Sequence, residues 1–191
     1  MAARPASDDP RSLRSREQIL AALHDTARAG TLTSISALST AAGVTRATFY
    51  NHFDTIEQAA WTAISESFDE LLEQDVNDRR QGIDPATVGI TSLTRIIEVL
   101  RAEQQLVRLA EGYGDESDLP GLAGIILALT HGFRANSNEP TTDISAAQDV
   151  YVSAGLYALL SSAARGHDDA ASAAAVAYSF LPEWMQRPSF S

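Results

Sequence analysis

Residues 34–53 have the pattern of two short helices joined by a tight turn at residues 42–44. The apolar residues of this segment are spaced to fill one small core; they are Ile35, Leu38, Ala42, Val44, Phe49 and Phe53. The second helix, which follows Thr45, carries mostly short polar, aromatic or basic side chains. In helix-turn-helix proteins a second helix of this kind enters the major groove of DNA. The segment therefore predicts a DNA-binding unit.

The residues around this segment predict where its helices begin. Ser34 and Thr45 are natural N-caps for the two helices of the motif. An earlier helix is expected over about residues 15–29, because residues 15–18 fit a capping box and Gly30 is placed to end the helix. These three helices form the predicted head of the molecule.

Almost every later segment repeats its apolar residues with helical spacing. Helices are expected over about residues 55–80, 85–107, 120–136, 145–166 and 169–181. Capping boxes at 55–58 and 145–148, and an aspartate at Asp168, predict three of the starts. The predicted fold is all-α, with a helix-turn-helix head and a larger helical body. The expected divisions are a disordered tail over 1–11, a DNA-binding domain over 12–54, and an effector-binding and dimerisation domain over 55–191.

The net charge of −11 is unevenly divided along the chain. Residues 1–60 hold six arginines and six acidic residues, whereas residues 61–191 hold eight arginines and 19 acidic residues. DNA repels an acidic body but not a neutral head, so this asymmetry favours a head that faces DNA. All 14 basic residues are arginines, so any phosphate contact from a basic side chain must use arginine.

No other group of residues indicates a catalytic site, a metal site or a cofactor site. The chain has no cysteine, which excludes disulfides and thiolate metal sites. Its histidines lack metal-ligand spacing, and no nucleophile–base, phosphate-loop or dinucleotide pattern occurs. We therefore expect no enzyme activity, no metal and no cofactor. The chain lacks a bilayer-spanning apolar run, and residues 1–10 lack the apolar core of a secretory signal, so we expect a cytoplasmic protein with no membrane partner.

Residues 19–57 resemble the tetracycline-repressor (TetR) family of regulators. The family's pattern around the turn is met by Ser34, Ile35, Leu38, Ser39, Ala42, Gly43, Val44 and Thr45, and its aromatic end by residues 49–53. Two positions depart from that pattern. Ile56 stands where the family often has a lysine that contacts phosphate, and Asp54 adds a negative charge near the expected DNA backbone.

Several side chains of the motif suit contacts with DNA. Arg46 suits a guanine edge or a phosphate, and Thr48 suits a base edge or a thymine methyl group. The small Ala47 lets the helix approach the groove closely. Ser34 and Thr45 offer hydroxyls and helix-start N–H groups to phosphates.

The resemblance adds Tyr50, Asn51 and His52 as contacts to phosphates or nearby bases. Arg14 and Arg16 suit a neighbouring phosphate or the minor groove. The alternative for each residue is structural. Tyr50 would lie half in the core, His52 would cap the small core, and the two arginines would be solvated residues at a helix start.

For the body, the resemblance implies an apolar pocket for a small-molecule effector and a homodimer built by the last two helices. The candidate pocket residues are Trp61, Phe68, Leu100, Tyr113, Leu129 and Phe133. The alternative is that these side chains only form the core. Residues 153–164 and 170–177 are rich in small side chains, which suits close helix packing across an interface; the alternative is genome composition and helix propensity.

The sequence thus predicts a homodimeric, ligand-responsive transcriptional regulator. We expect a repressor that an effector releases from a palindromic operator in double-stranded DNA. One alternative is a protein of the same fold that binds small molecules and has weak or lost operator binding, as Ile56, Asp54 and the net charge suggest. A second alternative, a small all-α enzyme, is opposed by the lack of a catalytic pattern.

Overall fold

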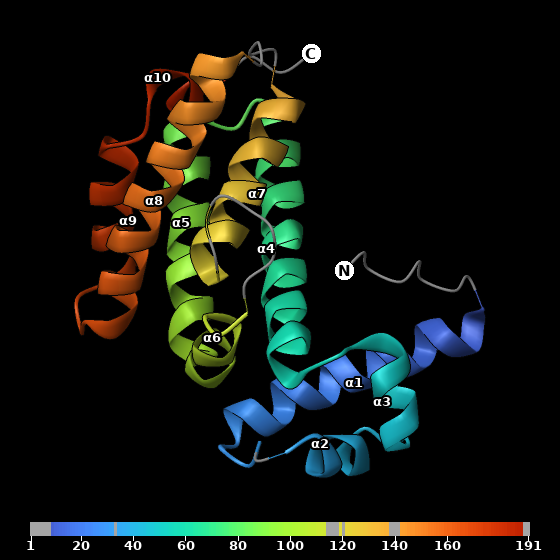
Figure 1. The fold of residues 1–191 in the computed structure, drawn as a ribbon. Helices are drawn as coiled ribbons and strands as arrows, with labels where there is room; N and C mark the ends of the chain where they lie inside the picture. Colours follow the sequence, from blue (N-terminus) through green and yellow to red (C-terminus); the bar gives the residue numbers. More distant parts are fainter. Residues whose placement is uncertain (1–8, 33, 114–118, 120, 138–141, 189–191) are drawn as a thin grey trace. The chain divides into compact units, whose positions relative to one another are not determined.

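The computed structural model describes residues 9–32, 34–113, 119, 121–137 and 142–188. These residues are helical and include no strand, so the predicted all-α fold is confirmed (Figure 1). The helices are α1 (Pro10–Arg28), α2 (Ile35–Ala41), α3 (Arg46–His52), α4 (Ile56–Arg80), α5 (Pro85–Ala102), α6 (Gln104–Ala110), α7 (Gly121–Asn136), α8 (Asp143–Arg165), α9 (Ala170–Ser179) and α10 (Glu183–Gln186).

The chain divides into two compact units. We call Met1–Ile64 with Glu103–Tyr113 the head, and Ser65–Ala102 with Gly114–Ser191 the body. The head thus contains the beginning of α4 and all of α6, in addition to α1, α2 and α3. The expected boundary between residues 54 and 55 remains a prediction about which part folds independently.

Helix α1 begins five residues earlier than expected. The side chain of Asp9 is the N-cap and accepts a hydrogen bond of 3.0 Å from the Arg11 N–H, and Pro10 occupies the first turn. An aspartate followed by proline is a strong start signal, because proline lacks the N–H that a first turn leaves unpaired. The expected cap, Ser15, instead lies inside the helix and donates to the Ser12 carbonyl. Residues 1–8 of the expected disordered tail lie outside the described residues.

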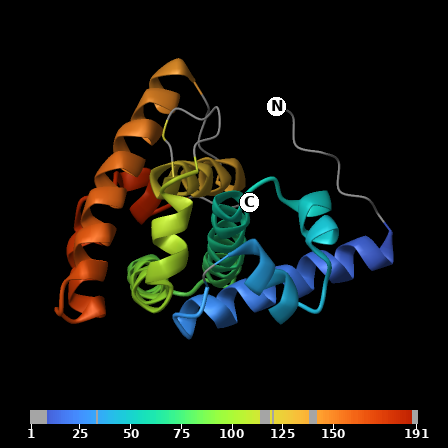
Figure 2. The same cartoon turned by 60° about the horizontal axis from the view of Figure 1, so that its bottom comes forward.

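The core of the head forms where α1 packs against α2 and α3 (Figure 2). Ile19 and Leu23 of α1, Leu38 of α2 and Phe49 of α3 are completely buried. The turn between α2 and α3 contains Gly43 with φ of 66°, a left-handed conformation that favours glycine. The expected core of the motif is therefore present, although Ile35 and Val44 are only half-buried.

The expected helix over residues 85–107 is interrupted at Glu103, so this prediction was wrong. Glu103 is 2% exposed, forms an ion pair with Arg28 of α1, and lies 3.3 Å from Nδ1 of His24 of the same helix. A buried carboxylate needs such partners. Glu103 therefore occupies the break between α5 and α6, because its partners lie on α1 and not on its own helix.

Two further helix starts differ from those expected. Thr142 and not Ser145 is the N-cap of α8: its hydroxyl accepts from the Ser145 N–H at 3.2 Å, and Ser145 Oγ accepts from the Thr142 N–H at 2.6 Å. Asp169 and not Asp168 caps α9, because its carboxylate accepts from the Ser172 N–H at 2.8 Å. Both starts lie within three residues of the expected positions.

The body is a helical bundle. Helix α5 packs against α8 and α9, α8 also packs against α7, and α8 and α9 lie side by side (Figure 1). Within the described part of the chain, no helix is long and apolar enough to cross a membrane.

Candidate functional site

Hydroxyl caps position the two helices of the motif as predicted. Ser34 Oγ accepts from the Ala37 N–H at 3.2 Å, and Thr45 Oγ1 accepts from the Thr48 N–H at 3.0 Å. The hydroxyls of Thr45 and Thr48 are also 2.8 Å apart. These contacts define the start of α3 at Arg46, so the caps already have a structural role in addition to their predicted phosphate contacts.

One side of α3 is anchored in the core and the other is exposed. Phe49 is completely buried, and its ring meets that of Tyr50 edge-on at 5.6 Å between centroids. The exposed residues are Arg46, Ala47, Tyr50 and Asn51, whereas Thr48 is half-buried. The exposed residues recur at positions one, two, five and six of the helix, so they share one face. The structure therefore brings most of the predicted base-contacting residues together.

His52 closes the contact between α3 and α1. Its Nε2 lies 2.7 Å from Ser15 Oγ. Burial, and to a lesser extent the positive charge of Arg16, lower the pKa of the His52 imidazole below its ordinary value. The neutral imidazole is therefore favoured, which suits a structural contact better than attraction to a phosphate.

The predicted arginines of α1 differ in their surroundings. The Arg16 guanidinium lies over the Phe53 ring, 5.9 Å from its centroid, whereas Arg14 is exposed. Stacking orients Arg16 against the core. The exposed side chain of Arg14 can change its conformation to reach a phosphate.

The start of α4 contains the two departures from the family pattern. Asp54 is exposed, and its N–H donates to Gln58 Oε1 at 2.6 Å. Thr55 Oγ1 accepts from the Gln58 N–H at 3.1 Å, so the predicted capping box is only partly formed: the Gln58 side chain reaches Asp54 instead of Thr55. Ile56 is half-buried and adds no charge here.

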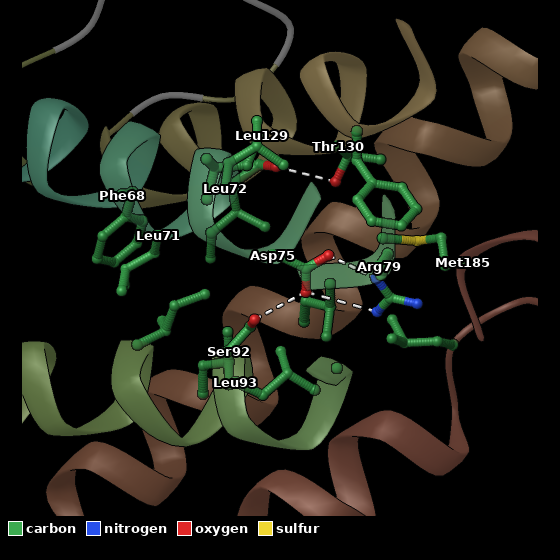
Figure 3. A pocket seen from close by; sticks show the side chains of 17 residues that line it. Phe68, Leu71, Leu72, Asp75, Arg79, Ser92, Leu93, Leu129, Thr130 and Met185 are labelled. Carbon is green, nitrogen blue, oxygen red and sulfur yellow. Dashed lines mark hydrogen bonds and ion pairs between the residues drawn. The ribbon is translucent and has the colours of Figure 1, made fainter. Parts of the chain in front are cut away.

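The body contains an apolar cavity of about 90 Å³ between α4, α5, α7 and α8 (Figure 3). It is lined by Phe68, Leu71, Leu72, Asp75, Arg79, Gly89, Ser92, Leu93, Ile96, Ile126, Leu129, Thr130, Phe133, Leu156, Leu160, Leu181 and Met185. Three predicted pocket residues, Phe68, Leu129 and Phe133, are among them. The other three are elsewhere: Trp61 and Tyr113 lie against each other in the head, with ring centroids 5.8 Å apart, and Leu100 is buried in the body away from the cavity lining.

A polar cluster that the sequence reasoning missed lies at this cavity. Asp75 accepts from Arg79 Nε at 2.6 Å and from Ser92 Oγ at 2.7 Å (Figure 3). The signal that could have revealed it is spacing. Asp75 and Arg79 continue the buried stripe of α4 that includes Ile64 and Phe68, so two charged residues occupy positions at which helical spacing predicts apolar residues.

Helices α8 and α9 expose large apolar side chains. Ile144 is 73% and Tyr151 is 82% exposed on α8, while Val176 of α9 and Phe180, which caps α9, are 53% and 72% exposed. Exposed apolar side chains that gather on adjoining helices are typical of an interface between proteins. Among the described residues, no group of three or more His, Cys, Asp or Glu side chains is placed to hold a metal ion.

Comparisons with known proteins identify the fold. No protein-family model and no curated protein matches the chain. It is similar to the crystal structure of Thermus thermophilus FadR, described as a TetR-family transcriptional repressor in complex with lauroyl-CoA: the TM-score is 0.57 and the identity 21%, over 88% of this chain and 96% of that chain. It is also similar to RolR in complex with its ligand resorcinol, with a TM-score of 0.52 and 16% identity, over 87% of this chain and 86% of that chain. The chain therefore has the fold of TetR-family transcriptional regulators, as its resemblance over residues 19–57 predicts.

Proposed function

We propose that this protein is a ligand-responsive, DNA-binding transcriptional regulator, and specifically a repressor that a small-molecule effector releases from its operator. The observation that carries this proposal is the exposed face of α3. A helix that buries Phe49 and presents Arg46, Tyr50 and Asn51 to solvent has the build of a recognition helix. The head, residues 1–64 with 103–113, has seven arginines and eight acidic residues and so a net charge of −1, against −10 for the body, which supports a head that approaches DNA.

The DNA contacts follow from the chemistry of the exposed face. Arg46 would read a guanine edge or bind a phosphate, and the small Ala47 would allow close approach. Tyr50 and Asn51 would contact phosphates or nearby bases. Arg14 would reach a neighbouring phosphate. Thr48, as a half-buried residue, would contact DNA only through its outer atoms.

The protein would form a homodimer through α8 and α9. One recognition helix reads too few base pairs for selectivity, so regulators of this kind pair two heads on a palindromic site. The exposed Ile144, Tyr151, Val176 and Phe180 supply an apolar surface for that pairing. Burial of these side chains against a second copy would remove their apolar area from water, which favours association.

The proposed effector binds in the body. The two similar structures are ligand complexes, one with lauroyl-CoA and the other with resorcinol. Their ligands differ so strongly that the shared fold supports a ligand-binding body without naming the ligand. An effector that prefers the state with low DNA affinity would shift the population toward it and release the operator.

In a second candidate function, the protein has the same fold but does not act by binding DNA. The exposed carboxylate of Asp54 and the uncharged Ile56 occupy the start of α4, where the family often supplies a positive charge. A small-molecule-binding protein with weak or lost operator affinity would have these features. Neither candidate assigns a catalytic role to any residue.

A binding selection decides between them. The purified protein would be incubated with random duplex DNA at near-physiological salt, and the bound sequences recovered. A recovered palindrome supports the dimeric regulator, and its affinity should fall steeply with salt because released counterions drive binding. Recovery of no sequence by a folded dimer would favour the second candidate.

A further inference from the structure

We propose that the body cavity binds a neutral, compact, mainly apolar molecule that carries one oxygen able to accept a hydrogen bond, and that Arg79 donates this bond. This inference deepens the proposed function and rests on it in taking the cavity as the effector site. The class of ligand follows from the chemistry of the residues that line the cavity.

The cavity favours an apolar ligand of small size. Most of its lining is aliphatic or aromatic, with side chains such as Phe68, Leu93 and Leu129. An apolar cavity of roughly 150 Å³ in another protein accepts benzene. The volume of about 90 Å³ here is smaller than that, so one ring is the upper limit of ligand size, and the lining side chains must move outward slightly to admit it.

Arg79 supplies an unused donor at this cavity. Its side chain is only 4% exposed. Nε donates to Asp75, but Nη1 is buried and has no hydrogen-bond partner among the described residues. A buried donor of a charged group is costly when it is unpaired, so a ligand oxygen at this place would bind favourably.

The rest of the cluster opposes a charged ligand. Asp75 already balances the charge of Arg79, and these two are the only ionisable side chains in the described lining of the cavity. A carboxylate added beside them would leave one uncompensated negative charge in an apolar cavity. A cationic ligand would find Asp75 already accepting from Arg79 and Ser92.

The surrounding residues hold the guanidinium in this position. Arg79 Cζ lies 5.2 Å from the centroid of the Phe133 ring, which favours a cation above the ring face. On α5, a Cβ atom added at Gly89 would lie 3.0 Å from Arg79 Nη2 and 2.5 Å from Tyr178 Cε2. A side chain at that position would push against both groups, so glycine keeps the space that the guanidinium occupies.

Three probes of one ring size test the inference with the full-length protein. Benzyl alcohol is neutral and carries an oxygen acceptor, toluene lacks one, and benzoate is anionic. Isothermal titration calorimetry without DNA should give an affinity for benzyl alcohol at least about tenfold higher than for toluene, because a hydrogen bond to a charged donor contributes that much. Benzoate should bind most weakly.

Variants locate the effect at the cluster. The double variant Asp75→Leu/Arg79→Met replaces a buried ion pair by apolar side chains of similar volume, a change that is often tolerated. It should bind toluene and lose the preference for benzyl alcohol. Leu129→Trp, which fills the cavity, should weaken both probes. Arg95→Met, at an exposed position of α5, should change neither.

Three results would overturn the inference: equal or tighter binding of toluene by the natural protein, tightest binding of benzoate, or no binding of any probe. The preference for benzyl alcohol surviving in the double variant would do the same. DNA binding is measured separately on the unliganded protein. If benzyl alcohol binds and no DNA sequence is selected, the proposed function fails while the ligand class stands; if an operator is selected and toluene binds as well as benzyl alcohol, only the ligand class fails.

Discussion

Removal of one carboxylate should destabilise the body strongly. Asp149 of α8 is 1% exposed and faces Arg134 of α7, which is 4% exposed. Arg134 donates to it through Nε at 2.9 Å and through Nη2 at 2.5 Å. Asp149→Ala leaves the guanidinium buried without this carboxylate. Breaking one side of such a pair costs about 3–5 kcal/mol, so the free energy of unfolding should fall by that amount.

Urea unfolding measured by tryptophan fluorescence tests this magnitude. The chain has two tryptophans, and Arg134 Cζ lies 3.9 Å from the ring centroid of one of them, Trp184. A Trp61→Phe background makes Trp184 the reporter of the body. At fixed protein concentration, a loss of 3–5 kcal/mol should lower the urea midpoint by at least about 1 M, given typical slopes.

Two control variants test whether burial of the ion pair causes the loss of stability. Asp78→Ala removes a half-buried carboxylate that accepts a solvent-exposed hydrogen bond from Gln74 Nε2 at 2.6 Å, and it should change the free energy of unfolding by less than about 0.5 kcal/mol. The double variant Asp149→Leu/Arg134→Met should recover most of the loss, because an apolar pair of similar volume leaves no buried charge. A single variant that costs under about 1 kcal/mol would show that the pair is not desolvated as the structure indicates.

Four further outcomes follow from the structure. Arg46→Ala should abolish selection of a specific DNA sequence in a binding assay while Arg95→Ala, at an exposed position of the body, leaves it intact; equal loss in both would point to general charge. Phe180→Arg should shift the protein from dimer to monomer in sedimentation at fixed concentration, because it places a charge on the exposed apolar surface, and an unchanged dimer would contradict the proposed interface. The lowered pKa of His52 means that its contribution to stability is present above pH 6.5 and is lost as the pH falls through the lowered value; urea midpoints at pH 7 and pH 5 should therefore differ less in His52→Asn than in the natural protein. Gly89→Ala should lower the melting temperature, since the new Cβ would meet Tyr178 at 2.5 Å, and an unchanged value would show that the Tyr178 ring moves freely.

Local hydrogen bonds made the head predictable. The caps Ser34 and Thr45 bond to N–H groups three residues away, so short patterns contain the whole interaction. The same holds for the end of α8 at Gly166, which caps it. The start of α1 differs from the prediction because the polarity of residues 1–11 indicates disorder, whereas Asp9 and Pro10 begin the helix inside that segment. The pair itself was an adequate signal.

Features that depend on distant partners were not predictable in this way. The break at Glu103 follows from His24 and Arg28, which belong to another helix far away in the sequence. The polar cluster at the cavity joins Asp75 of α4 to Ser92 of α5. The spacing of residues within one helix does not show which residues of another helix will pack against it. For the same reason, Trp61 and Leu100 share the periodicity of pocket residues without lining the cavity.

The discontinuous head limits how this protein can be recombined with others. Besides the contacts of Glu103 with Arg28 and His24, Gln105 Nε2 donates to the Leu32 carbonyl at 2.9 Å. Glu103 and the start of α6 therefore bind to α1 and to the loop that follows it. A chimera that transplants only residues 12–54 onto a foreign body would separate these partners, and Arg28 would face whatever residue the foreign chain supplies. Designers of hybrid sensors would therefore need to transfer residues 103–113 together with residues 12–54, or to rebuild the three contacts of Glu103 and Gln105 in the recipient.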